Sequence, residues 1–143
     1  MRTDKLRNLI GVDGTTAYMV FERTLVDGMP LLEIHAASPE NGPSRRISDV
    51  SPSRVPTWQI LNPSLSPGGK WIAMALADGF STNIWTLSTS TGEWRQITDF
   101  GGRPTFIARR VSWSSDGRSV LAAVADGDAD IFLLDGLLND GRD

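Results

Sequence analysis

The stretch PSLSPGGKWIAMALADGFSTNIWTLSTSTGEWRQIT, residues 63–98, decides the fold class. It alternates turn signals with hydrophobic runs: a Pro-Gly-Gly turn, an apolar run, an Asp-Gly turn, a second apolar run and a Thr-Gly turn before a short final run. Runs rich in β-branched and aromatic residues between such turns predict antiparallel hairpins. We therefore predict four successive strands, at about 61–66, 70–77, 82–88 and 93–98.

The same pattern occurs three times along the chain. A copy follows at 111–134, where Ser114-Ser115-Asp116-Gly117-Arg118 aligns with Ser66-Pro67-Gly68-Gly69-Lys70, and a fainter copy precedes it at 9–49. A period of roughly 40 to 50 residues with four strands per unit is typical of β-propeller blades. The sequence predicts an all-β chain of about three four-stranded antiparallel blades, the last one incomplete, at 9–52, 58–100 and 104–138, with flexible ends at 1–8 and 139–143.

Two of the predicted strands are almost continuously apolar, at 71–77 and 120–125. A strand with one face in water alternates between apolar and polar residues, so a continuous run predicts that both sheet faces are covered. Stacked blades provide that cover. No segment has apolar residues at helical spacing over three turns, and crossover helices for a buried parallel sheet are therefore not expected.

Composition excludes several classes of function. The 143 residues suit one domain, and the net charge of −3 gives no general attraction to nucleic acid. The chain has no cysteine, which rules out disulfides and thiolate metal sites. No apolar run approaches the roughly 20 residues of a membrane span. Residues 1–7 are basic, but the apolar core of a signal peptide does not follow them.

The residues that form these units resemble a known family. The turn PSLSPGGKWIA at 63–73, the strand Asn83-Ile84-Trp85 and the segment GEWRQIT at 92–98 are similar to the WD-like repeats of TolB-type β-propellers, and 111–118 with Asp130-Ile131-Phe132 is similar again. The sequence departs from the family pattern at Leu65, where Trp is usual, and at Gly68, where Asp is usual. The match is good over about 75 residues and loose over the first 50.

The resemblance implies a bacterial, periplasmic, non-enzymatic repeat protein that acts as a protein-interaction scaffold without a cofactor. Propellers have roughly 4–8 blades, and only three are predicted here, so we expect either part of a larger propeller or a homo-oligomer. In a closed ring the missing outer strand would come from the N-terminus, at 6–10. The alternatives are the propeller portion of a serine peptidase of the prolyl oligopeptidase type, or the sensor portion of a bacterial signalling protein, each with its catalytic domain outside this chain.

Two motifs with catalytic or metal-binding potential are weak. His35 is the single histidine, and no Gly-x-Ser-x-Gly elbow accompanies it, so we expect a structural role. Asp126-Gly127-Asp128-Ala129-Asp130 has the spacing that begins a calcium loop, but Ile131 and Leu137 stand where Gly and Glu are needed. We therefore expect no catalytic and no metal-binding residues.

Aromatic and basic residues provide the candidates for partner binding. We expect Trp71, Trp85 and Trp113 to pack between blades. The arginine clusters at 45, 46 and 54 and at 103, 109 and 110 are expected on the solvated surface, and the alternative for both is contact with an acidic partner or a phosphate. Aromatic residues are enriched at interaction hot spots. The partner-binding residues predicted from the sequence are Trp58, Trp94, Arg109 and Arg110.

Overall fold

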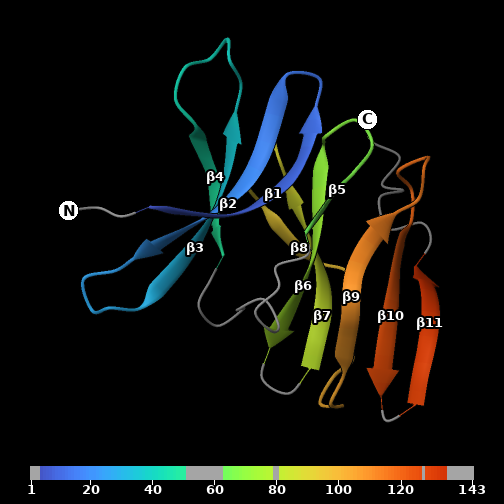
Figure 1. The fold of residues 1–143 in the computed structure, drawn as a ribbon. Helices are drawn as coiled ribbons and strands as arrows, with labels where there is room; N and C mark the ends of the chain where they lie inside the picture. The colour runs from blue at the N-terminus through green and yellow to red at the C-terminus, as the bar shows by residue number, and fades with distance from the viewer. Residues whose placement is uncertain (1–3, 51–62, 79–80, 127, 135–143) are drawn as a thin grey trace.

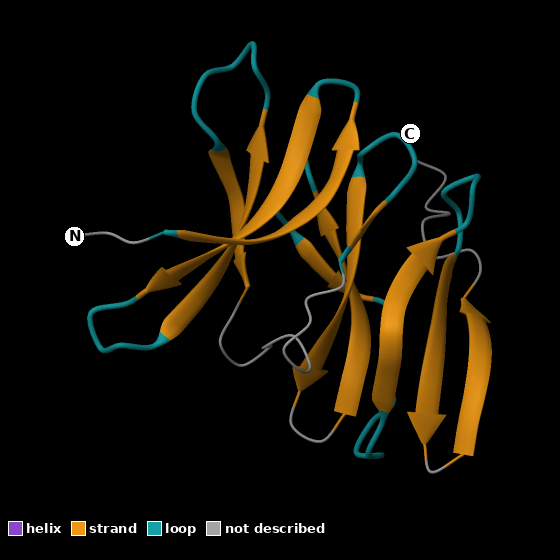
Figure 2. Ribbon diagram, in the orientation of Figure 1, coloured by secondary structure: helices purple, strands orange, loops and turns teal. Residues whose placement is uncertain are grey.

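Three antiparallel β-sheets make up the computed structural model of the chain, which describes residues 4–50, 63–78, 81–126 and 128–134. The described residues contain strands, turns and loops (Figure 2). No helix long and apolar enough to cross a membrane is found among them. The fold class predicted from the sequence, including the shorter last unit, agrees with this arrangement.

Sheet A has the order β1-β2-β3-β4 and sheet B the order β5-β6-β7-β8, while sheet C has the order β11-β10-β9. Every neighbouring pair is antiparallel, so each sheet is a simple meander. Figure 1 shows sheets A and C on opposite sides of sheet B. The strands are β1 Lys5–Asp13, β2 Thr16–Thr24, β3 Pro30–Ala37, β4 Arg45–Val50, β5 Ser64–Leu65, β6 Trp71–Asp78, β7 Ser81–Ser88, β8 Trp94–Gln96, β9 Phe106–Trp113, β10 Val120–Asp126 and β11 Asp128–Leu134.

Strand β1 begins earlier than the sequence predicted. It starts at Lys5 rather than at Leu9, and Lys5 and Leu6 pair with Glu22 and Phe21 of β2. Residues 5–8 therefore belong to sheet A, although they were predicted as a flexible lead-in. For the same reason residues 6–10 do not add a strand to sheet C. Strand β4 ends at Val50, within the first blade predicted at 9–52.

The turns before β6 and β10 confirm the repeat at the level of single hydrogen bonds. Ser66 N donates to Trp71 O at 2.8 Å, and Trp71 N donates to Ser66 Oγ at 3.0 Å. In sheet C, Ser114 and Ser119 form the same pair of bonds at 2.8 and 3.0 Å. The aligned serines thus close the same turn twice, because each satisfies a backbone group that the hairpin leaves unpaired.

Strand β8 is shorter than predicted because side chains replace part of its ladder. Thr98 Oγ1 accepts a hydrogen bond from Ile84 N at 2.9 Å and donates one to Asn83 Oδ1 at 2.9 Å. Ile97 N donates to Ile84 O at 2.8 Å. The chain therefore turns away after Gln96 while the backbone groups of β7 remain satisfied.

Sheet B is covered on both faces by two separate hydrophobic clusters. One face carries Ile72, Met74, Leu76, Trp85 and Leu87, which pack against sheet A. The opposite face carries Ala73 and Ile84, which pack against sheet C. The continuous apolar run at 71–77 therefore has the cause predicted from the sequence. The residues of sheets A and C in these clusters are Tyr18, Val20, Ile34, Ala36 and Val50 in the first, and Ile107, Val111, Val120, Ala122 and Val124 in the second.

Close backbone approach fixes the turns where sheets A and B meet. Gly69 has φ +67°, and a Cβ there would lie 2.7 Å from Asp13 Oδ2. Gly92 has φ +74°, and a Cβ there would lie 2.6 Å from Ile47 O. Both positions require glycine for two reasons, the left-handed backbone conformation and the neighbouring sheet.

Candidate interaction surface

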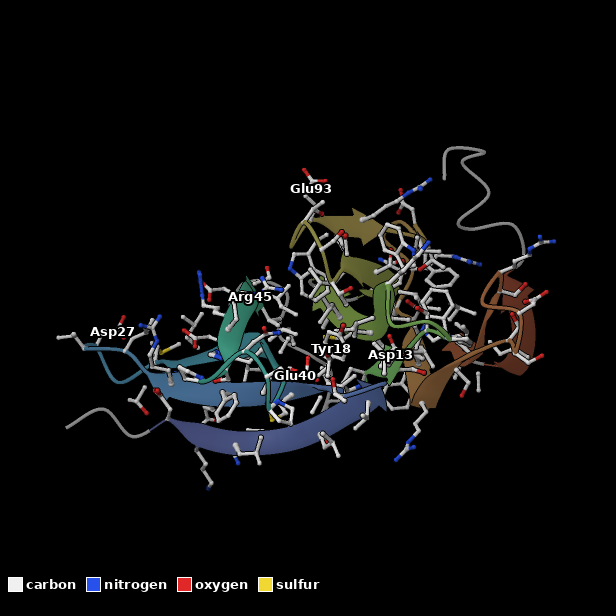
Figure 3. The ribbon with its side chains drawn as sticks, turned by 90° about the horizontal axis from the view of Figure 1, so that it is seen from above. Asp13, Tyr18, Asp27, Glu40, Arg45 and Glu93 are labelled. Carbon is white, nitrogen blue, oxygen red and sulfur yellow. The ribbon has the colours of Figure 1, made fainter. Side chains whose placement is uncertain are left out.

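Among the described residues, no other sheet covers the face of sheet A that is turned away from sheet B. We call it the front of sheet A. The register of β1 and β2 pairs Leu6 with Phe21, Leu9 with Met19 and Val12 with Ala17, and directly opposite residues share a face. The three β1 side chains are 54%, 57% and 59% exposed. In Figure 3, Tyr18 lies on the other side of this sheet, toward sheet B.

A charged group interrupts this apolar face. Glu33 is buried, and its carboxylate contacts Arg23 Nη2 at 3.0 Å and His35 Nε2 at 2.9 Å. The ring of His35 packs against Phe21 with centroids 4.9 Å apart. We call Arg23, Glu33 and His35 the Glu33 cluster. A buried carboxylate is tolerated when its charge is paired, and these two partners provide that pairing.

Glu33 and His35 of this cluster, taken together with Ser44, also have the composition of a catalytic triad. His35 Nδ1 lies 3.3 Å from Ser44 Oγ, while Nε2 contacts Glu33. A serine, a histidine and an acid in this sequence can activate a nucleophile when the hydrogen bonds are short and an oxyanion site adjoins the serine. Here the serine contact is at the long limit of a hydrogen bond, and Glu33 is shared with Arg23. The geometry therefore fits the structural role expected for His35.

The face of sheet C that is turned away from sheet B is the second open surface. We call it the back of sheet C. Register places Phe106 opposite Ala125 and Ser112 opposite Leu121 on this face, with Ala123 between them. Phe106 and Leu121 are 41% and 38% exposed. The continuous apolar run at 120–125 is thus covered on one face by sheet B and, among the described residues, is open on the other.

A cleft of about 410 Å³ lies where the first strands of the three sheets meet. Its lining includes Asp13 at the end of β1, Ser64 and Ser66 beside β5, and Arg110 and Ser112 of β9. Asp13 and Arg110 bring opposite charges to one opening. Among the residues with described side chains, no group of three or more metal-ligating residues is found.

Two of the four partner-binding residues predicted from the sequence, Trp94 and Arg110, have described side chains, and they belong to different sheets. Trp94 is half-buried between sheets A and B, where its Nε1 donates to Ser48 Oγ at 3.0 Å and Asp49 O at 3.3 Å. Arg110 lines the cleft. Arg109 belongs to β9, but its side chain lies outside the described part, as does all of Trp58.

Other sequence motifs have structural roles or lie outside the described residues. Arg46 pairs with Asp49 at 2.9 Å on the surface of β4. Trp85 is buried between sheets A and B, and Trp113 donates from Nε1 to Ser64 O at 2.8 Å, which joins sheets C and B. The side chains of the predicted calcium loop at 126–130 and all of Arg54 lie outside the described residues.

Comparison with known structures identifies the architecture. The chain resembles an acylaminoacyl peptidase in complex with Z-Gly-Gly-Phe-chloromethyl ketone (TM-score 0.58, 18% identity, 84% of this chain and 17% of that one). It is similar to TolB from Acinetobacter baumannii (TM-score 0.57, 17% identity, 87% and 28%). It also resembles the isopeptidase AtxE2 in its apo form (TM-score 0.60, 14% identity, 80% and 19%).

These similarities confirm the predicted fold class: the three sheets match propeller-containing proteins over most of this chain. The chain spans only 17 to 28% of the length of these structures, so it corresponds to a part of each. No family model matches the chain, and no curated protein matches its sequence. At identities below 20% the likeness establishes the fold alone.

Proposed function

We propose that the chain is a non-enzymatic β-propeller segment that binds other proteins through its open sheet faces. The observation that carries this proposal is the front of sheet A, where three large apolar side chains of one strand are more than half exposed. Isolated exposed apolar residues are common, but contiguous ones on a sheet face mark interaction sites. The resemblance to TolB supports the same interpretation.

Matched capture experiments test this function. The wild-type chain and the double variant Leu9→Arg/Val12→Arg would be immobilised and exposed to a lysate of the source organism, and bound proteins would be quantified by mass spectrometry. We expect the double variant to lose the proteins that the wild type retains, because two charges would have to be desolvated. Identical protein sets for both baits would contradict the proposal.

A hydrolase assay tests the non-enzymatic part of the proposal. The purified chain and the variant Ser44→Ala would be incubated with peptide and ester substrates. We expect no turnover above the uncatalysed rate in either sample. Turnover by the wild type that is lost in Ser44→Ala would show that the Ser44, His35 and Glu33 side chains act as a triad, and would overturn the proposal.

A second candidate function is the propeller portion of a serine peptidase. It is favoured by the similarity to the acylaminoacyl peptidase and the isopeptidase. In this role the cleft lined by Asp13 and Arg110 would face the hydrolase domain or its substrate. Sequencing the surrounding gene would decide: a following α/β domain with a Gly-x-Ser-x-Gly elbow supports the peptidase role, whereas a preceding kinase or DNA-binding domain supports a sensor role.

A further inference from the structure

We propose that the front of sheet A docks on the back of sheet C of a second copy of this chain, so that two chains close a six-bladed ring. This inference rests on the proposed function, because it names the partner that occupies the open faces. It is argued from the two sheet contacts that the single chain already makes.

The repeat assigns every strand position to one of two faces. Ile72, Met74 and Leu76 of β6 face sheet A, and the aligned Val120, Ala122 and Val124 of β10 face sheet B. We call the face of each sheet that is directed toward the preceding sheet its front, and the opposite face its back. Both sets of residues therefore lie on fronts. In β2, the residues at the same places after the turn are Ala17, Met19 and Phe21, which lie on the open front of sheet A. The front of sheet A is therefore the same kind of surface as two fronts that are buried elsewhere in the chain.

The back faces follow the same rule. The back of sheet B carries Ala73 and Ala75 on β6, and the front of sheet C packs against it. Leu121 and Ala123 of β10 are the aligned residues and lie on the open back of sheet C. Both internal contacts join a back to a front, with large residues on the front of sheet B and small ones on its back. Among the described residues, one front and one back remain uncovered, and a contact between them would repeat the back-to-front order of the two internal contacts.

The charges on the front of sheet A do not prevent such a contact. Glu33, which lies on this face, is already paired with Arg23 and His35. A partner sheet that covers this surface therefore leaves the Glu33 carboxylate partnered. Burial of a charge is strongly unfavourable only when its partner is missing.

Ring closure limits the number of copies. Two chains with three sheets each give six blades, within the usual range of roughly 4–8, whereas three chains would give nine. A twofold axis creates two identical front-to-back contacts, so no face remains open.

Paired surface variants test the proposal. Leu9→Arg blocks the front of sheet A and Leu121→Asp blocks the back of sheet C, while Val26→Arg is the control, because Val26 is exposed in the turn between β2 and β3. The solution mass of each purified chain would be measured by light scattering over a dilution series. Circular dichroism would verify the β-sheet content.

We expect wild type and Val26→Arg to be dimers. Each blocked variant alone should be monomeric at concentrations where wild type is a dimer, because its dimer dissociation constant should be raised about tenfold or more over that of wild type. An equimolar mixture of the two blocked variants should recover the dimer. In that mixture one contact is wild type on both sides, and in the other the introduced guanidinium faces the introduced carboxylate. If either variant loses its β-sheet signal, Leu6→Arg and Phe106→Asp replace the pair, because both positions are also exposed.

Three results would overturn the proposal. A wild-type monomer at every concentration excludes self-docking, and a dimer of Leu121→Asp alone indicates front-to-front contact instead. Neither result removes protein binding by the front of sheet A, which the capture experiment measures separately. A dimer of Leu9→Arg alone means that the front is not the docking surface, and it would count against both the inference and the proposed function.

Discussion

Sheets A and B are built from the same repeat, yet they have different surroundings. Sheet B packs between two sheets, and the side chains of β7 are buried from end to end. Sheet A has one covered face, and its front exposes Leu6, Leu9 and Val12. Both fronts carry large apolar side chains, and the front of sheet A also carries the Glu33 cluster. The fronts differ in their cover, because among the described residues no other sheet packs on the front of sheet A. Its exposed apolar side chains are the reason why we propose that another protein binds there.

The largest expected effect comes from one substitution made in both environments. Leu87 is fully buried between sheets A and B, whereas Leu9 is exposed on the front of sheet A. Leu87→Ala should lower the free energy of unfolding by about 2–5 kcal/mol, because it leaves a cavity. Leu9→Ala should change it by no more than about 0.5 kcal/mol. Urea denaturation at low protein concentration measures both, and equal losses would mean that the front of sheet A is covered in solution.

The aligned positions Ala73 and Leu121 give a second comparison. Ala73 is fully buried against sheet C, and Leu121 is on the open back of sheet C. Ala73→Leu should cost about 1–3 kcal/mol of unfolding free energy, since the added atoms have no space. Leu121→Ala should have a much smaller effect in the monomer. If Ala73→Leu is tolerated without loss in thermal denaturation, the contact between sheets B and C is looser than the structure indicates.

The Glu33 cluster distinguishes a buried ion pair from an exposed one. Glu33→Gln should reduce the free energy of unfolding by about 1–3 kcal/mol, because Arg23 and His35 lose their charged partner in a buried position. Asp49→Asn breaks the pair with Arg46 on the surface and should cost no more than about 1 kcal/mol. Denaturation at two salt concentrations measures both variants. A greater loss of unfolding free energy for Asp49→Asn than for Glu33→Gln would contradict the prediction that the buried ion pair contributes more to stability.

The smallest effect concerns the aligned turns of sheets B and C. Asp116 accepts hydrogen bonds from Ser114 Oγ at 2.5 Å and Arg118 N at 3.0 Å. Both bonds lower the pKa of the Asp116 carboxyl below the ordinary 3.8, and the bond from Ser114 has the larger effect. A carboxyl with a lowered pKa stabilises the folded state above pH 3.8, and this contribution is lost as pH falls through the folded pKa. Gly68 stands at the aligned place in sheet B and has no such group.

Asp116→Asn should therefore lower Tm slightly at pH 7, and the difference from wild type should shrink as pH falls below 3.8. Differential scanning calorimetry at pH 7 and pH 3 measures this change. The control is Ser115→Ala in the same turn, which should show no such pH dependence. A Tm difference for Asp116→Asn that is the same at both pH values would show that the carboxylate charge is not the cause.

Local chemistry made most of the architecture predictable from the sequence. Glycines with neighbouring Asp, Pro or Ser mark the turns, and β-branched and aromatic runs between them mark the strands. These signals depend on residues close together in the chain, and they predicted the order of the strands, the shorter last unit and the cover on both faces of β6. The sequence did not predict the start of β1 at Lys5, because residues 5–8 contain a single apolar residue, Leu6, and their pairing with β2 is not encoded locally.

The candidate surfaces depended on the tertiary structure. Arg23, Glu33 and Ser44 meet around His35 only because β2, β3 and the loop before β4 come together, and no spacing in the sequence predicts this. Trp94, which the sequence predicts to bind a partner, donates a hydrogen bond to Ser48 of the neighbouring sheet, a contact that no local pattern indicates. The sequence by itself determined strands, turns and the repeat, since these follow from local backbone preferences. Only the tertiary structure decided that the front of sheet A and the back of sheet C have no cover among the described residues, because burial depends on contacts between residues far apart in the chain.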